Sequence, residues 1–191
     1  MKSDFIIKNF TQKPLDSFDF IKPVKLTYEV NGKKKTWEAV KGFDSVAVLL
    51  YHKEKESFLL VKQFRAPVFL NDNTKTYTYE LCAGIIDKDK PLKEIVKEEI
   101  LEECGYDVNA QDIQKITSFF SNVGVGGSKQ HLFYAVINES QKVSKGGGID
   151  DEFILLEFIP LKKAKEFMFD ESKAKTSGLL FAFSWWIARQ L

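Results

Sequence analysis

Three glutamates in the middle of the chain have the spacing of a metal site. Glu99, Glu102 and Glu103 occupy positions i, i+3 and i+4. A helix turns about 100° per residue, so this spacing gathers the three carboxylates within about one quadrant of a helix surface. Like charges repel one another there, and a cation between them removes the conflict. Oxygen ligands suit a hard divalent ion, so the pattern favours Mg²⁺, with Mn²⁺ as the alternative.

The direction of these carboxylates decides between a metal site and a solvated acidic face, which is the common role of a charge run. On a helical wheel, one apolar arc is formed by Leu92, Ile95, Val96 and Ile100. Glu99 and Glu103 fall inside this arc, and Glu102 lies at its edge. Buried carboxylates need a partner, because an unpaired buried charge is costly. No neighbouring basic residue lies on the arc, so we expect a bound cation, unless a distant Lys or Arg neutralises the carboxylates.

The flanking residues predict the elements that position this helix. The β-forming residues from Tyr77 to Leu81 favour a strand, which Gly84 is expected to close. Pro91 stands near the helix start, where its missing N–H does no harm. Gly105 directly follows the helix, where a left-handed residue is usual. The expected order is a strand, a loop, an acidic helix and a glycine stop.

The stretch from Gly84 to Tyr106 resembles the Nudix box, G-x5-E-x7-R-E-U-x-E-E-x-G-U, in which U is a bulky apolar residue. The residues that match it without insertion or deletion are Gly84, Glu99, Ile100, Glu102, Glu103, Gly105 and Tyr106. Segments 61–65, 80–84, 102–106, 124–130 and 146–148 resemble the nucleoside-diphosphate-sugar branch of that family. The resemblance implies an α/β (α+β) Nudix fold, in which a mixed β-sheet is sandwiched between helices.

The resemblance also implies an activity. Within the branch, the chain is most similar to UDP-sugar diphosphatases, which implies metal-dependent cleavage of UDP-glucose to UMP and glucose 1-phosphate. Hydrolysis of ADP-ribose or another ADP-sugar is the alternative within the same branch. Two other classes stay open, namely a non-catalytic nucleotide sensor on this fold and an acidic helix that binds a protein.

Roles for individual residues follow from the resemblance. It implies metal ligands at the Ala83 carbonyl, Glu99, Glu102 and Glu103, and a catalytic role for Glu102 in orienting an additional ion. A general base is expected from the acidic loop 146–152, with Glu152 as first choice and Asp150 as second. Its three glycines would give that loop the freedom of a lid. The alternative is that these acids only cap and solubilise the next strand.

Substrate-binding residues are expected on two other segments. Arg65 ends a strand, on the same face as Gln63, and the resemblance implies that it contacts the substrate phosphates or a neighbouring subunit. The loop 124–130 offers Gly126, Ser128 and Lys129, together with free N–H groups that could cradle phosphates. A surface arginine and a plain hairpin turn are the respective alternatives. Glu80 matches a position near the metal site in the family.

Two residues depart from the Nudix box. Lys90 stands where the family has its first Glu, and Glu98 stands where it has Arg. Both signs are reversed together, so we expect a swapped ion pair that holds the loop against the helix. The expected metal ligands are all present.

Composition and charge limit the partners and the cellular compartment that the sequence favours. The chain has 191 residues and a net charge of +1, which implies neither nucleic acid nor a membrane surface as a partner. It has no long apolar run and no signal-peptide pattern at its start, and it has two cysteines, Cys82 and Cys104. These features favour a cytoplasmic protein with free thiols. A nucleophilic role for Cys104 is disfavoured, because no base is evident beside it.

The remaining pattern predicts an extension and a core. Strands at 24–30 and 35–40 around Asn31-Gly32 form a hairpin signal. We expect residues 1–42 to be an N-terminal β extension and 43–191 the Nudix domain. The resemblance implies that the extension forms a homodimer, often by strand exchange, although the hairpin could instead fold on its own subunit. Further strands are expected at 45–50, 58–64, 115–120, 130–137 and 152–159, a polar turn at 52–56, and helices at 161–169 and 176–190.

Overall fold

The computed structural model describes residues 5–14, 16–17, 21–149 and 152–189. Within these residues, seven strands form one mixed sheet in the order β5-β4-β3-β8-β7, with β6 paired to β3 and β9 paired to β4. Its strands are β3 (Ser45–His52), β4 (Ser57–Gln63), β5 (Thr78–Glu80), β6 (Cys82–Ile85), β7 (Gln114–Phe120), β8 (Lys129–Ile137) and β9 (Leu155–Pro160). β3 and β8 run parallel, and the other pairs are antiparallel.

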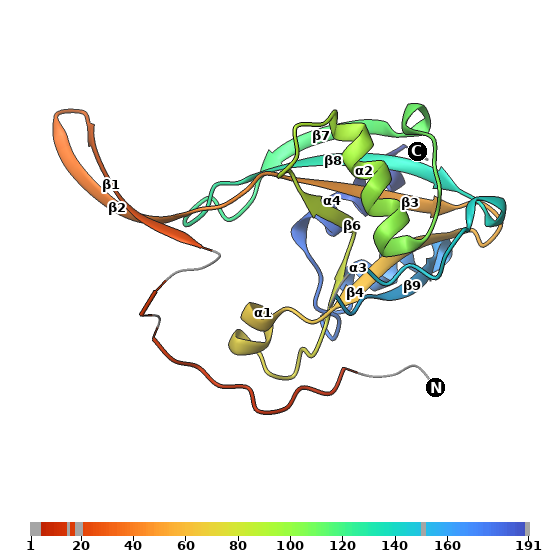
Figure 1. The fold of residues 1–191 in the computed structure, drawn as a ribbon, viewed down its shortest axis with the longest axis horizontal. Coiled ribbons are helices and arrows are strands. Elements are labelled where there is room, and N and C mark those ends of the chain that lie inside the picture. Colours follow the sequence, from red (N-terminus) through yellow and green to blue (C-terminus); the bar gives the residue numbers. More distant parts are fainter. Residues whose placement is uncertain (1–4, 15, 18–20, 150–151, 190–191) are drawn as a thin grey trace.

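Alternating side chains of the central strands divide the interior into two cores. Val46, Val48 and Leu50 face one core, which also contains Ile95 and Ile100 of the carboxylate helix. On the opposite face, residues such as Leu49 pack against α3 (Leu161–Phe169) and α4 (Ser177–Ala188). Figure 1 shows the sheet between α2 and the α3/α4 pair. This arrangement confirms the predicted sheet sandwiched between helices.

The carboxylate helix changes its type part-way along. It begins as α2 (Leu92–Glu99) and continues as the π-helix η1 (Ile100–Cys104), whereas the periodicity predicts one α-helix. A π turn bonds i to i+5 and inserts a residue into the ladder. It ends at Gly105, which has a φ of 74° and whose N–H bonds back to the carbonyls of Ile100 and Leu101. The predicted glycine stop is confirmed, and the uniform α periodicity is wrong.

Gly84 lies inside a strand and does not close one. The expected strand at 77–81 is β5, and β6 follows it after Leu81 with Gly84 paired to Val46 of β3. Two short strands replace the single predicted one because β5 bonds to β4 while β6 bonds to β3. The chain therefore crosses from one neighbour to the other, and this crossing places Ala83 and Gly84 beneath the carboxylate helix.

Two other predictions need correction, and one helix was not predicted. His52 ends β3 and is fully buried, so the polar turn contains residues 53–56 only. Residues 152–154 precede β9, because the Ile154 N–H bonds to the Gly147 carbonyl and pairing to β4 begins at Leu155. The short helix α1 (Ala66–Asn71) was not predicted, since its only local signal is Pro67 in the first turn. The last helix was predicted at 176–190 and spans Ser177–Ala188, with Thr176 as its N-cap, and Gln190 lies outside the described residues.

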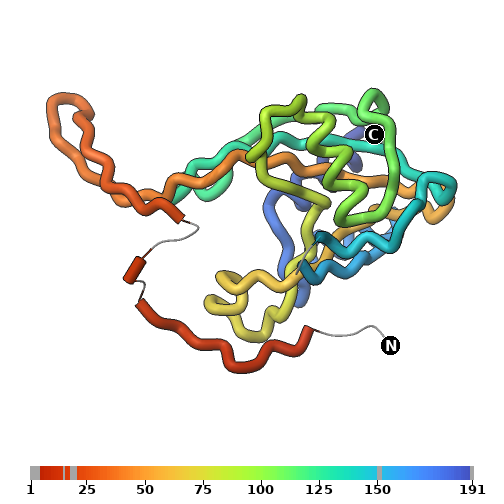
Figure 2. Tube along the Cα trace, viewed as in Figure 1, coloured from red at the N-terminus to blue at the C-terminus, as the bar shows by residue number. Residues whose placement is uncertain are grey.

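The predicted hairpin is present as a separate two-stranded sheet. β1 (Lys22–Val30) and β2 (Lys33–Lys41) are antiparallel, with Leu26 opposite Trp37. Figures 1 and 2 show this hairpin projecting from the body, with its base beside the loop that joins β7 to β8. At that base the Val40 N–H donates to the Val125 carbonyl, and the Trp37 indole donates to the Gly124 carbonyl.

Shorter 3₁₀ turns complete the described structure, at η2 (Ala110–Asp112) and η3 (Glu139–Gln141). None of the helices within the described residues is long and apolar enough to cross a membrane.

Candidate active site

The carboxylate of Glu99 lies directly against the backbone of β6. A Cβ added to Gly84 would stand 1.9 Å from Glu99 Oε1 and 2.1 Å from its carboxyl carbon. No side chain fits in that space while the carboxylate keeps its place. The requirement for glycine at this position therefore comes from the close approach of Glu99 to the strand.

Glu103 reaches the neighbouring residue of the same strand. Its side chain is buried, with the residue only 5% exposed, and its Oε2 accepts a hydrogen bond from the Ala83 N–H at 3.0 Å. Glu99 and Glu103 thus meet consecutive residues of β6, as the apolar arc of the helical wheel predicts. Glu102 is half-buried, and its charge acts on Glu99.

Burial changes the acidity of both inward carboxyl groups. It raises the pKa of Glu99 to about 7, with a further increase from the neighbouring charge of Glu102. It raises the pKa of Glu103 to about 8, although the hydrogen bond from Ala83 opposes this change. Among the described residues, no Lys, Arg or His forms an ion pair with Glu99, Glu102 or Glu103. The described residues thus place no protein cation in direct contact with these carboxylates, while the charges of Lys88 and Arg65 act on Glu99 and Glu103 without an ion pair.

The donor set fits a hard divalent cation. Carboxylate oxygens of Glu99, Glu102 and Glu103 and the carbonyl of Ala83 are the oxygen ligands that Mg²⁺ and Mn²⁺ prefer. In the part of the chain that the structure describes, no three acidic, His or Cys side chains already converge on one point. The carboxylates are therefore separate donors beside the strand in this structure.

The three glycines of the acidic loop pack on the end of the carboxylate helix. Gly146, Gly147 and Gly148 have φ values of 67°, 115° and 89°. The N–H of Gly147 donates to the Glu103 carbonyl at 2.8 Å, and the N–H of Gly148 donates to the Glu102 carbonyl at 3.2 Å. Left-handed backbone and close contact, in addition to loop freedom, therefore explain this glycine run.

The first-choice base lies beside the carboxylates. Glu152 is exposed, its Oε2 accepts from the Ile149 N–H at 3.2 Å, and its charge contributes to the raised pKa of both Glu99 and Glu103. Asp150, the second choice, lies outside the described residues.

Arg65 is engaged by a carboxylate. Its Nε and one terminal nitrogen each donate to Glu80 at 2.8 Å, in the paired geometry that suits guanidinium and carboxylate. Glu80 also accepts from the Thr78 hydroxyl. The hydrogen bond to Glu80 raises the pKa of Arg65, and the charges of Glu103 and Glu152 act in the same direction. Arg65 therefore borders the carboxylate cluster, with Glu80 as its partner.

The loop at 124–130 does not offer the expected free N–H groups. The N–H groups of Val125, Gly126 and Gly127 all point to the Asn122 carbonyl, at 2.9, 2.8 and 3.2 Å. They close a turn, so the prediction of a ready phosphate cradle is wrong for these three groups. The loop instead forms one wall of a hollow of about 550 Å³ at the hairpin base, lined by Val40, Gly42, Asn122, Val123, Gly124, Val125, Gly126 and Ser128.

Ser128 and Lys129 hold the end of this loop on the sheet. The Ser128 carbonyl accepts from the Ser121 N–H at 2.8 Å, and the Lys129 N–H donates to Asp44 Oδ1 at 2.8 Å. The Lys129 ammonium lies 5.3 Å from the centre of the Phe120 ring. The Ser128 hydroxyl and the Lys129 ammonium are the groups that remain for a ligand.

The two residues with reversed charge in the Nudix box, Lys90 and Glu98, contact each other. Lys90 and Glu98 form an ion pair, and Lys88 approaches the other oxygen of Glu98 at 3.3 Å. Both lysines lower the pKa of Glu98 by hydrogen bonding. The predicted swapped pair is confirmed as a contact, with Lys88 as an additional member that the sequence pattern did not indicate.

Sequence reasoning missed the side chain that contacts the end of the carboxylate helix. The Lys142 ammonium donates to the Cys104 carbonyl at 2.6 Å, across a separation of 38 residues. No local pattern around Lys142 signals this contact. Cys104 and Cys82 are both buried free thiols, and burial raises the pKa of Cys82, so the structure gives no support to a nucleophilic cysteine.

Known proteins resemble this chain over most of its length. Uridine diphosphate glucose pyrophosphatase NUDT14 of Bos taurus is 34% identical over 197 aligned residues, covering 88% of this chain and 89% of the relative. GDP-mannose pyrophosphatase of Cronobacter sakazakii is 36% identical over 123 residues, covering 64% of this chain and 63% of the relative. A crystal structure of an ADP compounds hydrolase has a similar fold, with a TM-score of 0.70, 17% identity, and coverage of 93% of this chain and 92% of that one.

The NUDIX domain family matches residues 41–179, which include the carboxylate helix, the β6 strand and the acidic loop. The chain belongs to the NUDIX domain family.

Proposed function

We propose that this protein is a metal-dependent diphosphatase of nucleoside diphosphate sugars, with UDP-glucose as its main substrate and UMP and glucose 1-phosphate as products. The observation that carries the proposal is the pair of inward carboxylates, Glu99 and Glu103, set on consecutive residues of β6 with no ion-pair partner among the described residues. The curated relatives support the choice of substrate class, since they are named as pyrophosphatases of uridine diphosphate glucose and of GDP-mannose.

The proposed chemistry assigns a task to each group. A divalent cation held by Glu99, Glu102, Glu103 and the Ala83 carbonyl would offset the charge of the diphosphate and lower the pKa of a bound water. Mg²⁺ is the proposed ion, and Mn²⁺ the substitute. Glu152 accepts the proton of the attacking water, with Asp150 as the alternative base. The water oxygen bonds to one phosphorus while the bridging P–O bond to the other phosphate breaks. One phosphate stays on UMP, and the other stays on glucose 1-phosphate.

The substrate is proposed to lie between the carboxylates and the β7–β8 loop. Arg65 borders the diphosphate while its partner Glu80 fixes the direction of the guanidinium. Ser128 and Lys129 contribute through their side chains, and Gly126 contributes by shaping the turn, since its N–H is engaged by Asn122.

The hairpin supports a homodimer. Its β1 strand exposes four apolar residues at every second position, namely Val24, Leu26, Tyr28 and Val30, each at least 38% exposed. Trp37 lies opposite Leu26 on β2 and is 54% exposed. Side chains at alternate positions share one face of a strand, so these residues form an apolar face on a hairpin too thin to bury it. We propose that residues 1–42 form a dimerisation element whose apolar face packs against a second copy of the chain. Residues 43–191 form the catalytic domain, and the protein acts in the cytoplasm.

A substrate panel tests the proposal. UDP-glucose, GDP-mannose, ADP-ribose and ADP-glucose are assayed with Mg²⁺ and with EDTA, by phosphatase-coupled phosphate release. We expect the highest kcat/KM for UDP-glucose and no turnover in EDTA. Preference for ADP-ribose would favour the alternative substrate class, and binding without turnover would favour a nucleotide sensor.

A base variant tests the assignment within the site. Glu152→Gln keeps the size of the side chain and removes its basicity. We expect kcat to fall by about 10²-fold to 10⁴-fold, with a smaller change in KM. If Glu152→Gln and Asp150→Asn both keep the parental kcat, the acidic loop does not supply the base.

A further inference from the structure

The end of the carboxylate helix is capped by a distant segment of the chain. We name residues 138–148 the strap. Its donors reach four consecutive carbonyls: Gly148 N–H to Glu102, Gly147 N–H to Glu103, the Lys142 ammonium to Cys104, and the N–H groups of Val143 and Ser144 to Gly105. The last carbonyls of a helix have no partner within the helix, so the strap supplies the hydrogen bonds that these groups lack.

Lys142 is the charged member of this set. Its ammonium lies 2.6 Å from the Cys104 carbonyl and 4.5 Å from the centre of the Tyr106 ring. Tyr106 and Lys142 also form a backbone bridge. A cation at the C-terminal end of a helix is favoured by the helix dipole, and the half-buried position of Lys142 limits screening by water. Lys142 therefore binds the strap to the residue next to Glu103 by a strong, directional contact.

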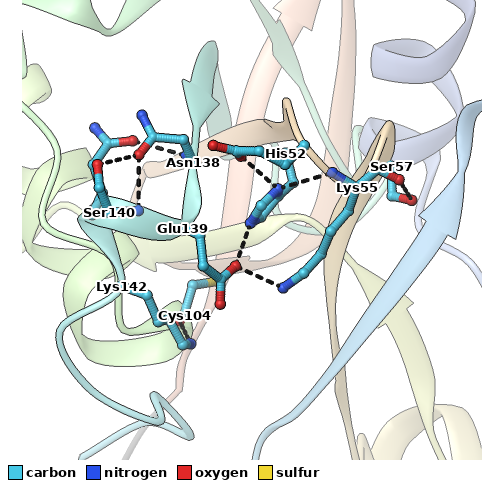
Figure 3. Close-up of polar contacts among 10 residues, drawn as sticks. His52, Lys55, Ser57, Cys104, Asn138, Glu139, Ser140 and Lys142 are labelled. Atoms are coloured by element: carbon cyan, nitrogen blue, oxygen red, sulfur yellow. Dashed lines mark hydrogen bonds and ion pairs between the residues drawn. The ribbon is translucent and has the colours of Figure 1, made fainter.

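The start of the strap is fixed to the far end of β3. Figure 3 shows the carboxylate of Glu139 between the ring of His52 and the ammonium of Lys55, with distances of 3.1 Å and 3.0 Å. The His52 ring is fully buried, and its Nδ1 accepts from the Lys55 N–H at 3.3 Å. With Nδ1 accepting from Lys55, Nε2 is the ring nitrogen that can donate to Glu139, while Glu54 Oε2 lies 3.4 Å from Nδ1.

The strap leads directly into the acidic loop. The Gly147 carbonyl accepts from the Ile154 N–H at 3.2 Å, and Ile149 donates to the Glu152 carboxylate. The same short segment therefore contacts the backbone of Glu102 and Glu103 on one side and orients Glu152 on the other.

We propose that Lys142 is a positioning residue. It holds the strap on the helix end and so fixes the positions of Glu102 and Glu103 relative to Glu152. Glu139, which contacts His52 and Lys55, fixes the start of the strap to the end of β3. This inference rests on the proposed function, since it assigns the strap a role in holding the proposed metal ligands.

The test compares Lys142→Met, which keeps an unbranched side chain one atom shorter and removes its charge, with Lys142→Arg, which keeps a cationic donor. Lys163→Met is the matched control, because Lys163 is an exposed lysine of α3 that pairs only with Glu166 among the described residues. The measurements are Mn²⁺ binding by calorimetry, amide hydrogen exchange at Gly147 and Gly148, the melting temperature in EDTA, and kcat and KM at saturating Mg²⁺.

We expect Lys142→Met to weaken Mn²⁺ binding by about 10-fold and to lower kcat by a similar factor, as loss of an outer-shell partner does. KM should stay within about twofold, and amide exchange at Gly147 and Gly148 should accelerate by about 10-fold. Lys142→Arg should recover most of both losses, and Lys163→Met should match the parent.

The inference is overturned if Lys142→Met lowers the melting temperature but leaves Mn²⁺ affinity, glycine exchange and kcat unchanged, since Lys142 would then be structural only. If Lys142→Met does not fold, Glu139→Gln decides, and parental Mn²⁺ affinity with parental amide exchange at Gly147 and Gly148 in that variant would overturn the inference. A parent that hydrolyses no nucleotide sugar, while Lys142→Met still weakens Mn²⁺ binding, would refute the proposed function alone. A parent that binds no Mn²⁺ would refute both.

Discussion

Replacing Gly84 by alanine should displace the Glu99 carboxylate while leaving the stability of the fold almost unchanged. The new Cβ would stand 1.9 Å from Glu99 Oε1, and ordinary contact begins at 3.4 Å, so the carboxylate must move by about 1.5 Å (3.4 − 1.9). The carboxylate is the end of a flexible side chain, so it moves more readily than the strand does. The backbone at Gly84 does not have a positive φ, so alanine meets no backbone strain there.

The expected result is a loss of activity with little loss of stability. A displacement of about 1 Å at a reacting centre costs on the order of 100-fold, so kcat/KM for UDP-glucose should fall by about 100-fold, or about 2.7 kcal/mol. Mn²⁺ affinity should fall by about 10-fold or more. Alanine is not worse than glycine in a strand, so the melting temperature should stay within about 4 °C.

The assay uses steady-state kinetics, Mn²⁺ calorimetry and thermal unfolding in EDTA. Gly124→Ala is the control for thermal unfolding and Mn²⁺ binding, because a Cβ at Gly124 meets nothing within 4 Å. In a Glu99→Ala background, Gly84→Ala should cost almost nothing more, since the two changes act on one group. A folded Gly84→Ala protein with parental kcat/KM and Mn²⁺ affinity would refute the claim that the position of Glu99 matters.

Three further predictions concern acidity, the reversed charge pair and the hairpin. Without metal, burial raises the pKa of Glu99 to about 7 and of Glu103 to about 8, above their usual 4.5. Their contribution to stability is therefore full below pH 4.5 and is lost as pH rises through 7 and 8. In EDTA the melting temperature should fall by about 5 °C between pH 6 and pH 9, Glu103→Gln should flatten this fall, and a rise would contradict the reasoning. For the charge pair, Lys90→Glu with Glu98→Arg should keep the parental melting temperature and kcat, while each single change lowers both; additive losses would exclude the pairing. For the hairpin, Leu26→Asp should convert a dimer to a monomer in light scattering, and an unchanged mass would show that the exposed face is not the interface.

Local patterns predicted the elements whose signals lie within a few residues. The apolar arc around Ile95 and Ile100 predicted which carboxylates turn inward, and the structure places Glu99 and Glu103 there. The strand at 45–50 and the stop at Gly105 were also predicted, since a short apolar run and a left-handed glycine are local properties.

The missed features depend on contacts between distant residues. His52 reads as part of a polar turn, yet its ring is buried against Tyr106 and Phe158 and pairs with Glu139, 87 residues away. The π turn at Ile100–Cys104 lies where the helix contacts the strap, and no local residue type specifies it. The glycines at 146–148 suggested only mobility, whereas their positive φ values follow from docking on the helix end.

The central claim is that Glu99 and Glu103 hold a divalent cation on which hydrolysis depends. The most direct test is Mn²⁺ calorimetry on the parent and on the Glu99→Gln/Glu103→Gln double variant, with UDP-glucose turnover measured on the same samples. The parent should bind Mn²⁺, and the folded double variant should lose Mn²⁺ binding and turnover together. A double variant that still hydrolyses UDP-glucose at the parental rate would contradict it.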